Sequence, residues 1–401
     1  MITGNEIKVH FAQAKDILVG WDEYIVQAML AIMTREHVLW IGGPGAGKSY
    51  AARIMFNLFS DVHTMRIQLT KDMMPENLIG NQIADEFLKT GKEVYYTDGG
   101  LTQVQFFFGD EFEDASDYLI RTLLTIMNER LFERKDVQIV CPLHTGILTT
   151  NFDRASKAIE AMKDRILFKA EIPAVSGYVS EVEMYRRYMQ YVGEVPALKT
   201  IPYAAMKEVA DLVERPDGIL VPNGVQLATA ALVDRYWKAL VEKLAKDGQP
   251  QPDIISPRTR VKLMDVVRAS AFLAGREIAD YEDLALLKYV LCKLGADKTA
   301  ERVFTEQHSQ IMPASKAARD RWDQLGALSE AVAALQKPAE GFDEVVLRIG
   351  QRVKTYTKIE FEQLLQSLRS SCKKAEIDVL NGIEAEYKNI GVKPDVVTFT
   401  W

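Results

Sequence analysis

A glycine-rich segment near the start of the chain is the most informative part of the sequence. It reads Gly42-Gly43-Pro44-Gly45-Ala46-Gly47-Lys48-Ser49 and matches the pattern G-x-x-x-x-G-K-S/T. The apolar run Val38–Ile41 comes directly before it, and a helical pattern begins at Tyr50. A strand, a glycine-rich loop and a helix in this order predict a phosphate-binding loop.

The residue types of this loop suit a nucleotide bound together with magnesium. Glycines let successive backbone N–H groups point at phosphate oxygens, and the start of the following helix adds partial positive charge. Lys48 can reach the β- and γ-phosphates, and Ser49 can offer its hydroxyl to Mg²⁺. Tyr50 is expected beside the nucleotide. The alternative is a glycine-rich turn with an incidental lysine, which this context disfavours.

Two adjacent acids follow another apolar run. Residues 105–108 lead through Gly109 to Asp110 and Glu111. Carboxylates at that point would lie at the carboxyl ends of the strands, where α/β proteins bind their ligands. We expect Asp110 to orient the Mg²⁺ shell and Glu111 to polarise the attacking water. The alternative is a solvated turn, and Gly109 is expected to loosen the end of the strand.

A polar residue also ends a further apolar run. Residues 146–149 lead to Thr150 and Asn151. Asn151 would lie beside the two acids, where its amide could hold the attacking water or the γ-phosphate. The alternative is an asparagine that caps the next helix.

The hydrophobic pattern divides the chain into three parts. Up to about residue 174, apolar runs at 38–41, 65–69, 105–108 and 146–149 alternate with helical patterns, which predicts a parallel sheet with α/β connections. From Tyr178 to about Gly295 the pattern is helical throughout, with helices expected at 181–192, 203–213, 224–244, 257–273 and 281–294. This stretch is predicted to be a separate helical domain.

The last hundred or so residues have a third character. Apolar residues recur at helical spacing over 325–335 and again over 342–353, with a break between the two runs. We expect a helical hairpin of coiled-coil type, followed by sequence of strand type at 396–401. The predicted divisions are therefore residues 1–175, 176–296 and 297–401.

Composition excludes several classes of protein. Hydrophobic residues make up 48% and charged residues 26%, which is typical of a globular chain, and no apolar run is long enough to cross a bilayer. A net charge of −7 argues weakly against binding to a phosphate backbone. Three scattered cysteines without a CxxC spacing favour a cytoplasmic protein with reduced thiols. The five histidines form no zinc-binding pattern.

Taken together, these motifs resemble an AAA+ ATPase of the MoxR class, closest to its RavA-like members. The resemblance runs from about Val19 to Leu294. It is carried by the phosphate loop and the acids, by 75–80 and 93–101, which resemble the family's insert in its second helix, and by the run 123–132. The runs 161–166 and 255–258 also match, and they contain Arg165 and Arg258.

The resemblance implies a fold and a set of binding residues. Residues 1–175 would form an AAA+ αβα core with an insert at about 75–101, and 176–296 an all-α lid. ATP and Mg²⁺ would be the ligands, with Val19 and Gly20 packing on the adenine. The tail at 297–401 matches no family segment, so its role cannot be transferred.

The resemblance also implies an assembly. Arg165 would be an arginine finger that acts on the nucleotide of an adjacent subunit, which implies a head-to-tail ring, a homo-hexamer in this family. Arg258 would contact the nucleotide of its own chain from the lid. The alternatives are an Asp164–Arg165 surface ion pair and an Arg258 on the polar face of its helix. Arg130 fits either a subunit interface or a cation at a helix C-terminus.

Three functions remain open from the sequence. The favoured one is ATP-driven, chaperone-like remodelling of protein clients, with a von Willebrand A-type protein as partner. A nucleotide-gated scaffold with slow hydrolysis is the second, and the presence of Glu111 and Arg165 argues against it. A nucleic-acid motor or nuclease-associated ring is the third, which the acidic balance disfavours.

Overall fold

The structure is a computed structural model, and it divides the described residues into two compact units. The N-terminal unit holds Met1–Ile219, Ser256–Arg276 and Leu287–Ala300; the C-terminal unit holds Leu220–Ile255, Glu277–Leu286 and Glu301–Trp401. The described residues are 2–80, 83, 88–89, 99–134, 137–151, 157–191, 196–295, 297–335, 344–345, 353–389 and 396–400. The units therefore alternate along the chain, and the predicted division at 175 and 296 stays a prediction.

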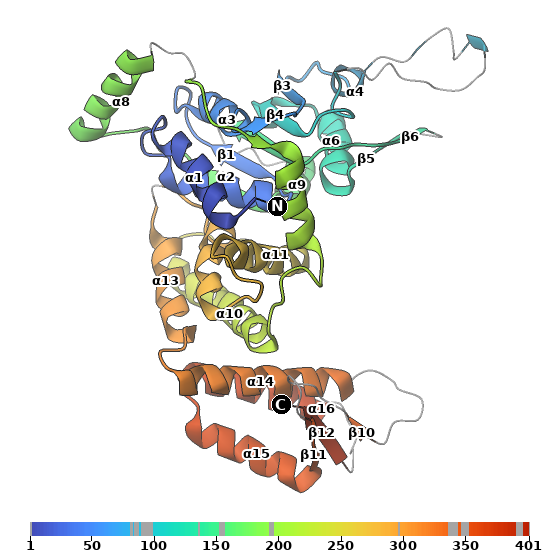
Figure 1. Cartoon of the computed structure of the whole chain (residues 1–401), viewed down its shortest axis with the longest axis vertical. Coiled ribbons are helices and arrows are strands. Elements are labelled where there is room, and N and C mark those ends of the chain that lie inside the picture. The colour runs from blue at the N-terminus through green and yellow to red at the C-terminus, as the bar shows by residue number, and fades with distance from the viewer. Residues whose placement is uncertain are drawn as a thin grey trace. The chain divides into compact units, whose positions relative to one another are not determined.

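A five-stranded parallel sheet forms the centre of the N-terminal unit (Figure 1). Its order is β3 (Thr64–Gln68), β4 (Phe106–Asp110), β7 (Thr145–Thr150), β1 (Val38–Ile41) and β8 (Phe168–Glu171). The four predicted strands and the α/β class are confirmed. β8 was not predicted, because Lys169 and Glu171 interrupt its apolar run while only Phe168 and Ala170 are buried.

Helices cover both faces of this sheet. On one face, α6 (Asp117–Glu129) and α7 (Lys157–Arg165) pack on a cluster that includes Leu39, Phe107 and Leu148. On the other, α2 (Asp22–Met33) packs on β1 and β8, and α3 (Lys48–Phe56) packs on β4 and β7. Burial on both faces explains why the strands read as nearly continuous apolar runs.

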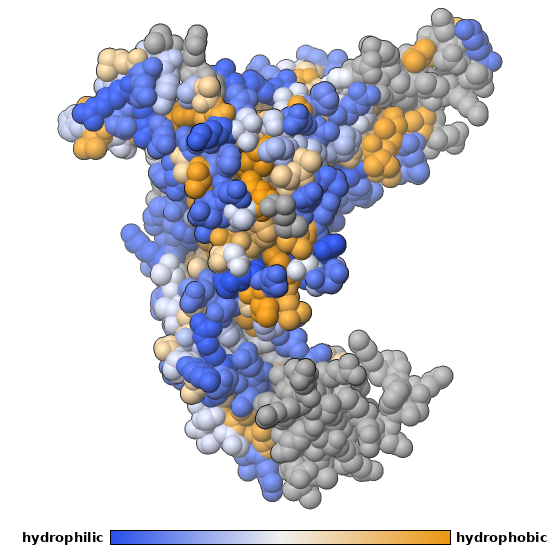
Figure 2. Space-filling view, viewed as in Figure 1, coloured by the Kyte–Doolittle hydropathy of each residue, from blue (hydrophilic) through white to orange (hydrophobic). Residues whose placement is uncertain are grey.

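Further elements complete the N-terminal unit. They are α1 (Gly4–Lys15), β2 (Phe59–Ser60), α4 (Glu76–Ile79), η1 (Phe112–Asp114), β5 (Leu131–Arg134), β6 (Val137–Val140), α8 (Tyr178–Tyr191), β9 (Ile201–Pro202), α9 (Tyr203–Glu214), α11 (Pro257–Leu273) and α12 (Lys288–Leu291). Figure 2 shows apolar side chains over the β5–β6 hairpin, where Val140 is exposed. Most of the predicted insert at 75–101 lies outside the described residues.

The C-terminal unit combines helices with a small sheet. Its elements are α10 (Asn223–Lys246), η2 (Tyr281–Leu287), α13 (Thr299–Ile311), α14 (Lys316–Leu335), β10 (Glu344–Val345), β11 (Val353–Thr357), α15 (Lys358–Ser371), α16 (Lys374–Asn389) and β12 (Val396–Thr400). The predicted helix at 281–294 is instead a 3-10 turn followed by the short α12. Among the described helices, none is long and apolar enough to span a membrane.

Most of the second half of the predicted C-terminal helical hairpin, at 342–353, lies outside the described residues, and its described positions are not helical. α14 confirms a helix over 325–335, but 344–345 and 353–357 are strands. β11 pairs antiparallel with β12, so that Thr355 lies opposite Thr398. The β-branched and aromatic residues of the two segments favour this pairing over local helical spacing. The strand predicted at the end of the chain is confirmed as β12.

Candidate functional site

The glycine-rich loop joins β1 to α3, as the sequence predicts. Gly45 has φ of +80° and Gly47 φ of +84°, a left-handed conformation that glycine adopts without strain. At Gly42, a Cβ atom would lie only 2.6 Å from the carbonyl oxygen of Ile172. The loop thus needs its glycines for backbone geometry. Its N–H groups and the N-terminus of α3 provide the setting for a phosphate.

Lys48 lies at the centre of the loop. Its side chain is buried, and Nζ donates to the carbonyl oxygens of Gly42 (2.5 Å) and Gly43 (3.0 Å) and to Oδ1 of Asn151 (2.9 Å). Burial lowers the pKa of Lys48, although Asp110 and Glu111 oppose that shift. The structure therefore brings Asn151 to the phosphate-binding lysine, next to the acids where it was expected.

A hydroxyl and a carboxylate meet beside the loop. Ser49 Oγ donates to Asp110 Oδ2 at 2.8 Å, and Thr149 Oγ1 donates to the other oxygen of Asp110. Mg²⁺ prefers hard oxygen ligands and keeps several waters, so one carboxylate with one hydroxyl fits it. The described residues contain no cluster of three or more His, Cys, Asp or Glu that would make an all-protein metal site. Thr149 was missed, because threonine in a strand has no distinguishing signal in the sequence.

Glu111 follows β4 in a left-handed conformation, with φ of +53°. Its Oε2 accepts a hydrogen bond from Nε2 of Gln68 at 2.5 Å, and Gln68 is the last residue of the neighbouring β3. The positive φ turns the chain immediately after Asp110, so the two carboxylates take different partners. Gln68 was also missed, and only the strand order β3–β4 identifies it.

Gly109 does not loosen the strand end as expected. β4 continues to Asp110, with Gly109 opposite Leu148 of β7. A Cβ atom at Gly109 would lie 2.8 Å from Leu148 Cδ2 and 3.2 Å from Leu69 Cδ1. A larger residue here would force the ends of the Leu148 and Leu69 side chains to shift, which is the reason that glycine fits before Asp110.

A first cavity of about 530 Å³ opens beside the phosphate loop, and we call it the loop cavity. It is lined by Ile17, Leu18, Val19, Trp21, Gly43, Pro44, Gly45, Ala46, Gly47, Tyr50, Ala174, Val175, Met184, Arg187, Tyr188 and Tyr191. Val19 and Tyr50 were predicted here. Gly20 is not among the lining residues, but its φ of +77° turns the chain between Val19 and Trp21. The mainly apolar and aromatic lining suits a flat nucleobase.

A second cavity of about 280 Å³ lies in the same unit, and we call it the arginine cavity. It is lined by Arg35, Glu36, Met127, Asn128, Arg130, Asp164, Arg165, Leu167, Glu214, Arg258, Thr259 and Lys262. Helices α6, α7 and α9 all end here, and helix C-termini favour cations. The cavity thus gathers five basic side chains from segments far apart in the sequence.

Arg165, predicted as catalytic, and Arg258, predicted as nucleotide-binding, both line the arginine cavity. Arg165 Nη1 donates to the carbonyl oxygen of Ala161 at 2.7 Å, and Arg258 Nη1 lies 3.8 Å from Asp164 Oδ2. Neither arginine lines the loop cavity. Arg258 was expected at the nucleotide of its own chain, and the structure instead places it beside Asp164. The reason is that the first turn of α11 packs at the end of α7.

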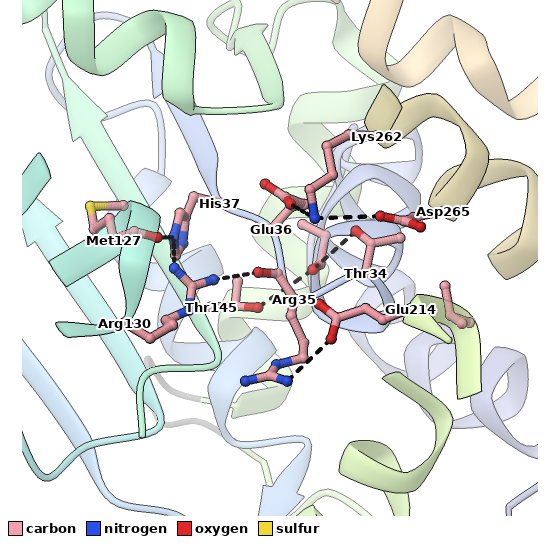
Figure 3. Close-up of polar contacts among 12 residues, drawn as sticks. Thr34, Arg35, Glu36, His37, Met127, Arg130, Thr145, Glu214, Lys262 and Asp265 are labelled. Carbon is pink, nitrogen blue, oxygen red and sulfur yellow. Dashed lines mark hydrogen bonds and ion pairs between the residues drawn. The ribbon is translucent and has the colours of Figure 1, made fainter. Parts of the chain in front are cut away.

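Arg130 supports the wall of this cavity from inside (Figure 3). Its Nη2 donates to the carbonyl oxygen of Arg35 at 2.5 Å, and Nη1 lies 2.8 Å from Nε2 of His37. Burial lowers the pKa of Arg130 to about 10. Of the two readings left open by the sequence, the structure favours a cation at the C-terminus of α6.

Comparisons with known proteins agree with this geometry. A family model described as the MoxR domain in MoxR-vWA-beta-propeller ternary systems matches residues 5–184. Chaperone MoxR1 of Mycobacterium tuberculosis is 26% identical over 288 residues, which cover 68% of this chain and 70% of that protein. An uncharacterised protein of Methanocaldococcus jannaschii, MJ0079, is 24% identical over 268 residues, and the match spans 67% of this chain but only 65% of that relative.

A solved structure shares the fold. It is the crystal structure of a protein from Cytophaga hutchinsonii, described as a candidate ATPase, with a TM-score of 0.56 and 21% identity. The match covers 77% of this chain and 93% of that one. At this identity the likeness concerns the fold alone. None of these matches singles out RavA-like members, so that closer resemblance stays a prediction.

Proposed function

Because this chain carries an AAA+ ATPase domain of the MoxR class, we propose that it binds and hydrolyses ATP with Mg²⁺ in a ring of identical subunits. One observation carries the catalytic part of the proposal. Lys48, Asn151, Asp110 and Glu111 come together at the carboxyl ends of adjacent strands, with the phosphate loop between them.

The side chains at this edge divide the chemistry among them. Lys48 neutralises charge on the β- and γ-phosphates, and Ser49 with Asp110 holds the metal, which would stabilise charge on the phosphate oxygens. Glu111 accepts the hydrogen bond of the attacking water, and Gln68 keeps that carboxylate in place. Asn151 accepts from Lys48 through Oδ1, which leaves its side-chain N–H groups to donate to the γ-phosphate or to the water.

The arginine cavity supports a ring. Arg165 and Arg258 line the arginine cavity and not the loop cavity of their own chain, which supports contact with the nucleotide of a second copy. A surface that acts on a different surface of the next copy gives head-to-tail contacts, which close into a ring when the rotation permits. We propose a hexamer, and we assign Arg258 to the neighbouring nucleotide together with Arg165.

The proposed biological role is chaperone-like remodelling of protein clients. The matching family model is named for systems that also contain a vWA component, and one relative is named a chaperone. We therefore propose a von Willebrand A-type protein as partner, with ATP hydrolysis driving changes in the partner or its client. Residues 297–401 are proposed as a docking segment, with the small sheet of β10, β11 and β12 as its core.

ATP turnover and assembly of the full chain test this function. The wild type is expected to release phosphate from ATP–Mg²⁺ and to assemble beyond single chains, measured by phosphate release and light scattering. Glu111→Gln keeps the hydrogen bond from Gln68 within reach but cannot act as a base, so it should bind ATP and assemble without turnover. No turnover and no assembly by the wild type with any nucleotide would refute the proposal.

A further inference from the structure

The turn between α2 and β1 contacts several elements that are distant in sequence (Figure 3). Arg35 has φ of +52°, a conformation that costs a non-glycine residue free energy. Its Nη1 lies 3.2 Å from Glu214 Oε2 of α9, and its carbonyl oxygen accepts from Arg130 at the end of α6. The turn is thus held in place from two sides, directly before β1 begins.

An ion cluster joins the same turn to α11. Lys262 Nζ lies 2.9 Å from Glu36 Oε1 and 3.4 Å from Asp265 Oδ2. Both carboxylate side chains are only 13% exposed. Burial raises the pKa of the Glu36 carboxyl, and Lys262 opposes that shift. Burial also acts to lower the pKa of Lys262, but Glu36 and Asp265 raise it overall. A cluster this buried holds its geometry better than a surface ion pair does.

Lys262 lies one helical turn after Arg258. Residues four apart share a face of a helix, and both of these line the arginine cavity with Glu36. Arg258 itself is weakly held, because its ion pair with Asp164 is long, at 3.8 Å, and both side chains are more than 40% exposed. The ion pair of Lys262 is shorter and more buried, so it holds the start of α11 more firmly than the Arg258–Asp164 pair does.

We propose that Glu36 and Lys262 are positioning residues for Arg258. Their ion pair fixes the first turn of α11 against the turn before β1, and thereby holds Arg258 beside Arg165 for the nucleotide of a neighbouring subunit. The same turn leads into β1, whose end carries the phosphate loop. The inference rests on the proposed action of the arginines on a neighbouring subunit.

A mixing experiment with two full-length variants tests this. Arg165→Ala subunits bind ATP but lack the finger, and we call them acceptors. Lys48→Ala subunits cannot hold ATP but keep both arginines, and we call them donors. The mixture should hydrolyse ATP although each variant alone does not. Lys262→Met is then added to either the donor or the acceptor, and phosphate release is measured.

The effect should depend on which subunit carries the change. Lys262→Met in the donor should lower the activity of the mixture about tenfold or more, since a misplacement of about 1 Å can cost a hundredfold in rate. The same change in the acceptor should alter it less than about twofold. Glu36→Gln should show the same asymmetry, and Lys262→Arg, which keeps the charge, should preserve most of the donor's activity.

Two further variants test whether Lys262 acts through Arg258. Adding Lys262→Met to a donor that already carries Arg258→Ala should cause no further loss, because a residue that acts through Arg258 has nothing left to position. Lys238→Met is the matched control, since Lys238 is an exposed helical lysine 2.8 Å from Asp234, and it should leave the mixture unchanged.

The outcomes separate the two proposals. Equal losses in donor and acceptor for both Lys262→Met and Glu36→Gln would assign the ion pair a merely structural role and overturn the inference. Full additivity with Arg258→Ala would overturn it as well. An inactive parent mixture of Arg165→Ala and Lys48→Ala would instead refute the action of the arginines between subunits, and the inference would fall with it.

Discussion

The loop cavity and the arginine cavity lie in one unit but are assembled by different means. One continuous loop contributes Gly43 to Gly47 to the loop cavity, and Lys48 lies beside it with Asp110 and Asn151 from neighbouring strand ends. The arginine cavity comes from side chains of α6, α7, α9, α11 and the turn before β1. The arginine cavity holds five basic side chains beside the carboxylates of Glu36, Asp164 and Glu214.

This difference predicts that changes in the two cavities affect different steps. A change in the loop cavity should lower the affinity for the nucleotide. A change in the arginine cavity should leave affinity intact and lower turnover, because we propose that its arginines act on the nucleotide of another subunit. Changes in the framework of either cavity should act on stability first.

The largest effect is expected at Arg165. Arg165→Ala should reduce the steady-state ATPase rate by about a thousandfold or more, the range that arginine fingers contribute in other nucleotide hydrolases. Binding of a fluorescent ATP analogue should stay within about twofold of the wild type. Turnover at the wild-type rate would show that the two cavities do not cooperate across subunits.

Lys48 should show the opposite pattern. Lys48→Ala removes a buried cation that contacts Gly42, Gly43 and Asn151, and should weaken ATP binding about a hundredfold, measured by titration calorimetry. Lys207→Ala is a suitable control, because Lys207 is exposed on α9 and forms its ion pair with Asp211 of the same helix. Unchanged affinity in Lys48→Ala would remove this lysine from the phosphate site.

The framework of the loop cavity can be tested at Gly109. Gly109→Ala should lower the free energy of unfolding by about 1–3 kcal/mol, since the added methyl overlaps Leu148 and Leu69. Urea denaturation measures this directly. Gly43→Ala is the comparison, because a Cβ atom there meets no atom within 4 Å. A stability loss as large at Gly43 as at Gly109 would contradict the packing argument.

The framework of the arginine cavity should respond to pH. His37 is buried, with Nδ1 accepting from the N–H of Gly146 and Nε2 lying 2.7 Å from the carbonyl oxygen of Met127 and 2.8 Å from Nη1 of Arg130. Burial, with Arg130 nearby, lowers the pKa of His37 well below its usual range. Burial likewise lowers the pKa of His144 to about 3.

The sign follows from these depressed pKa values. The unfolded chain binds protons on both histidines near pH 6.5 while the folded chain does not, so stability is lost as pH falls through that value. Between pH 7.5 and 6 the two should lower the free energy of unfolding by about 1.5 kcal/mol. His63 is exposed, so His63→Gln should leave this slope unchanged. A stability that rises toward pH 6 would contradict the assignment of both rings as neutral.

Local sequence was sufficient for the loop cavity and for the parallel sheet. Gly42 to Ser49 are consecutive, and the strands that carry Asp110 and Asn151 are marked by their own apolar runs. The partners of these residues were not predictable. Gln68 and Thr149 reach the acids only because β3 and β7 flank β4. The order of strands in a sheet cannot be predicted from the sequence of each strand alone.

The C-terminal sheet illustrates the same limit. Apolar residues recur at helical spacing over 342–353. At the end of that run, however, 353–357 form a strand that pairs with 396–400, some forty residues away. Local periodicity indicates which residues of a segment are apolar. It does not exclude that the same residues form a strand when a distant segment is available for pairing.

Arg258 illustrates both what the sequence predicts and what only the tertiary structure decides. Its motif, the hydroxyl cap and the helix that begins at Pro257 were all readable from consecutive residues. Its location was not, because a helix is formed by neighbours in the chain whereas its docking depends on Glu36 and Asp164, far away in sequence. A site made of consecutive residues can therefore be predicted from the sequence. A site made of side chains from several helices is formed only by tertiary packing, which the sequence order does not show.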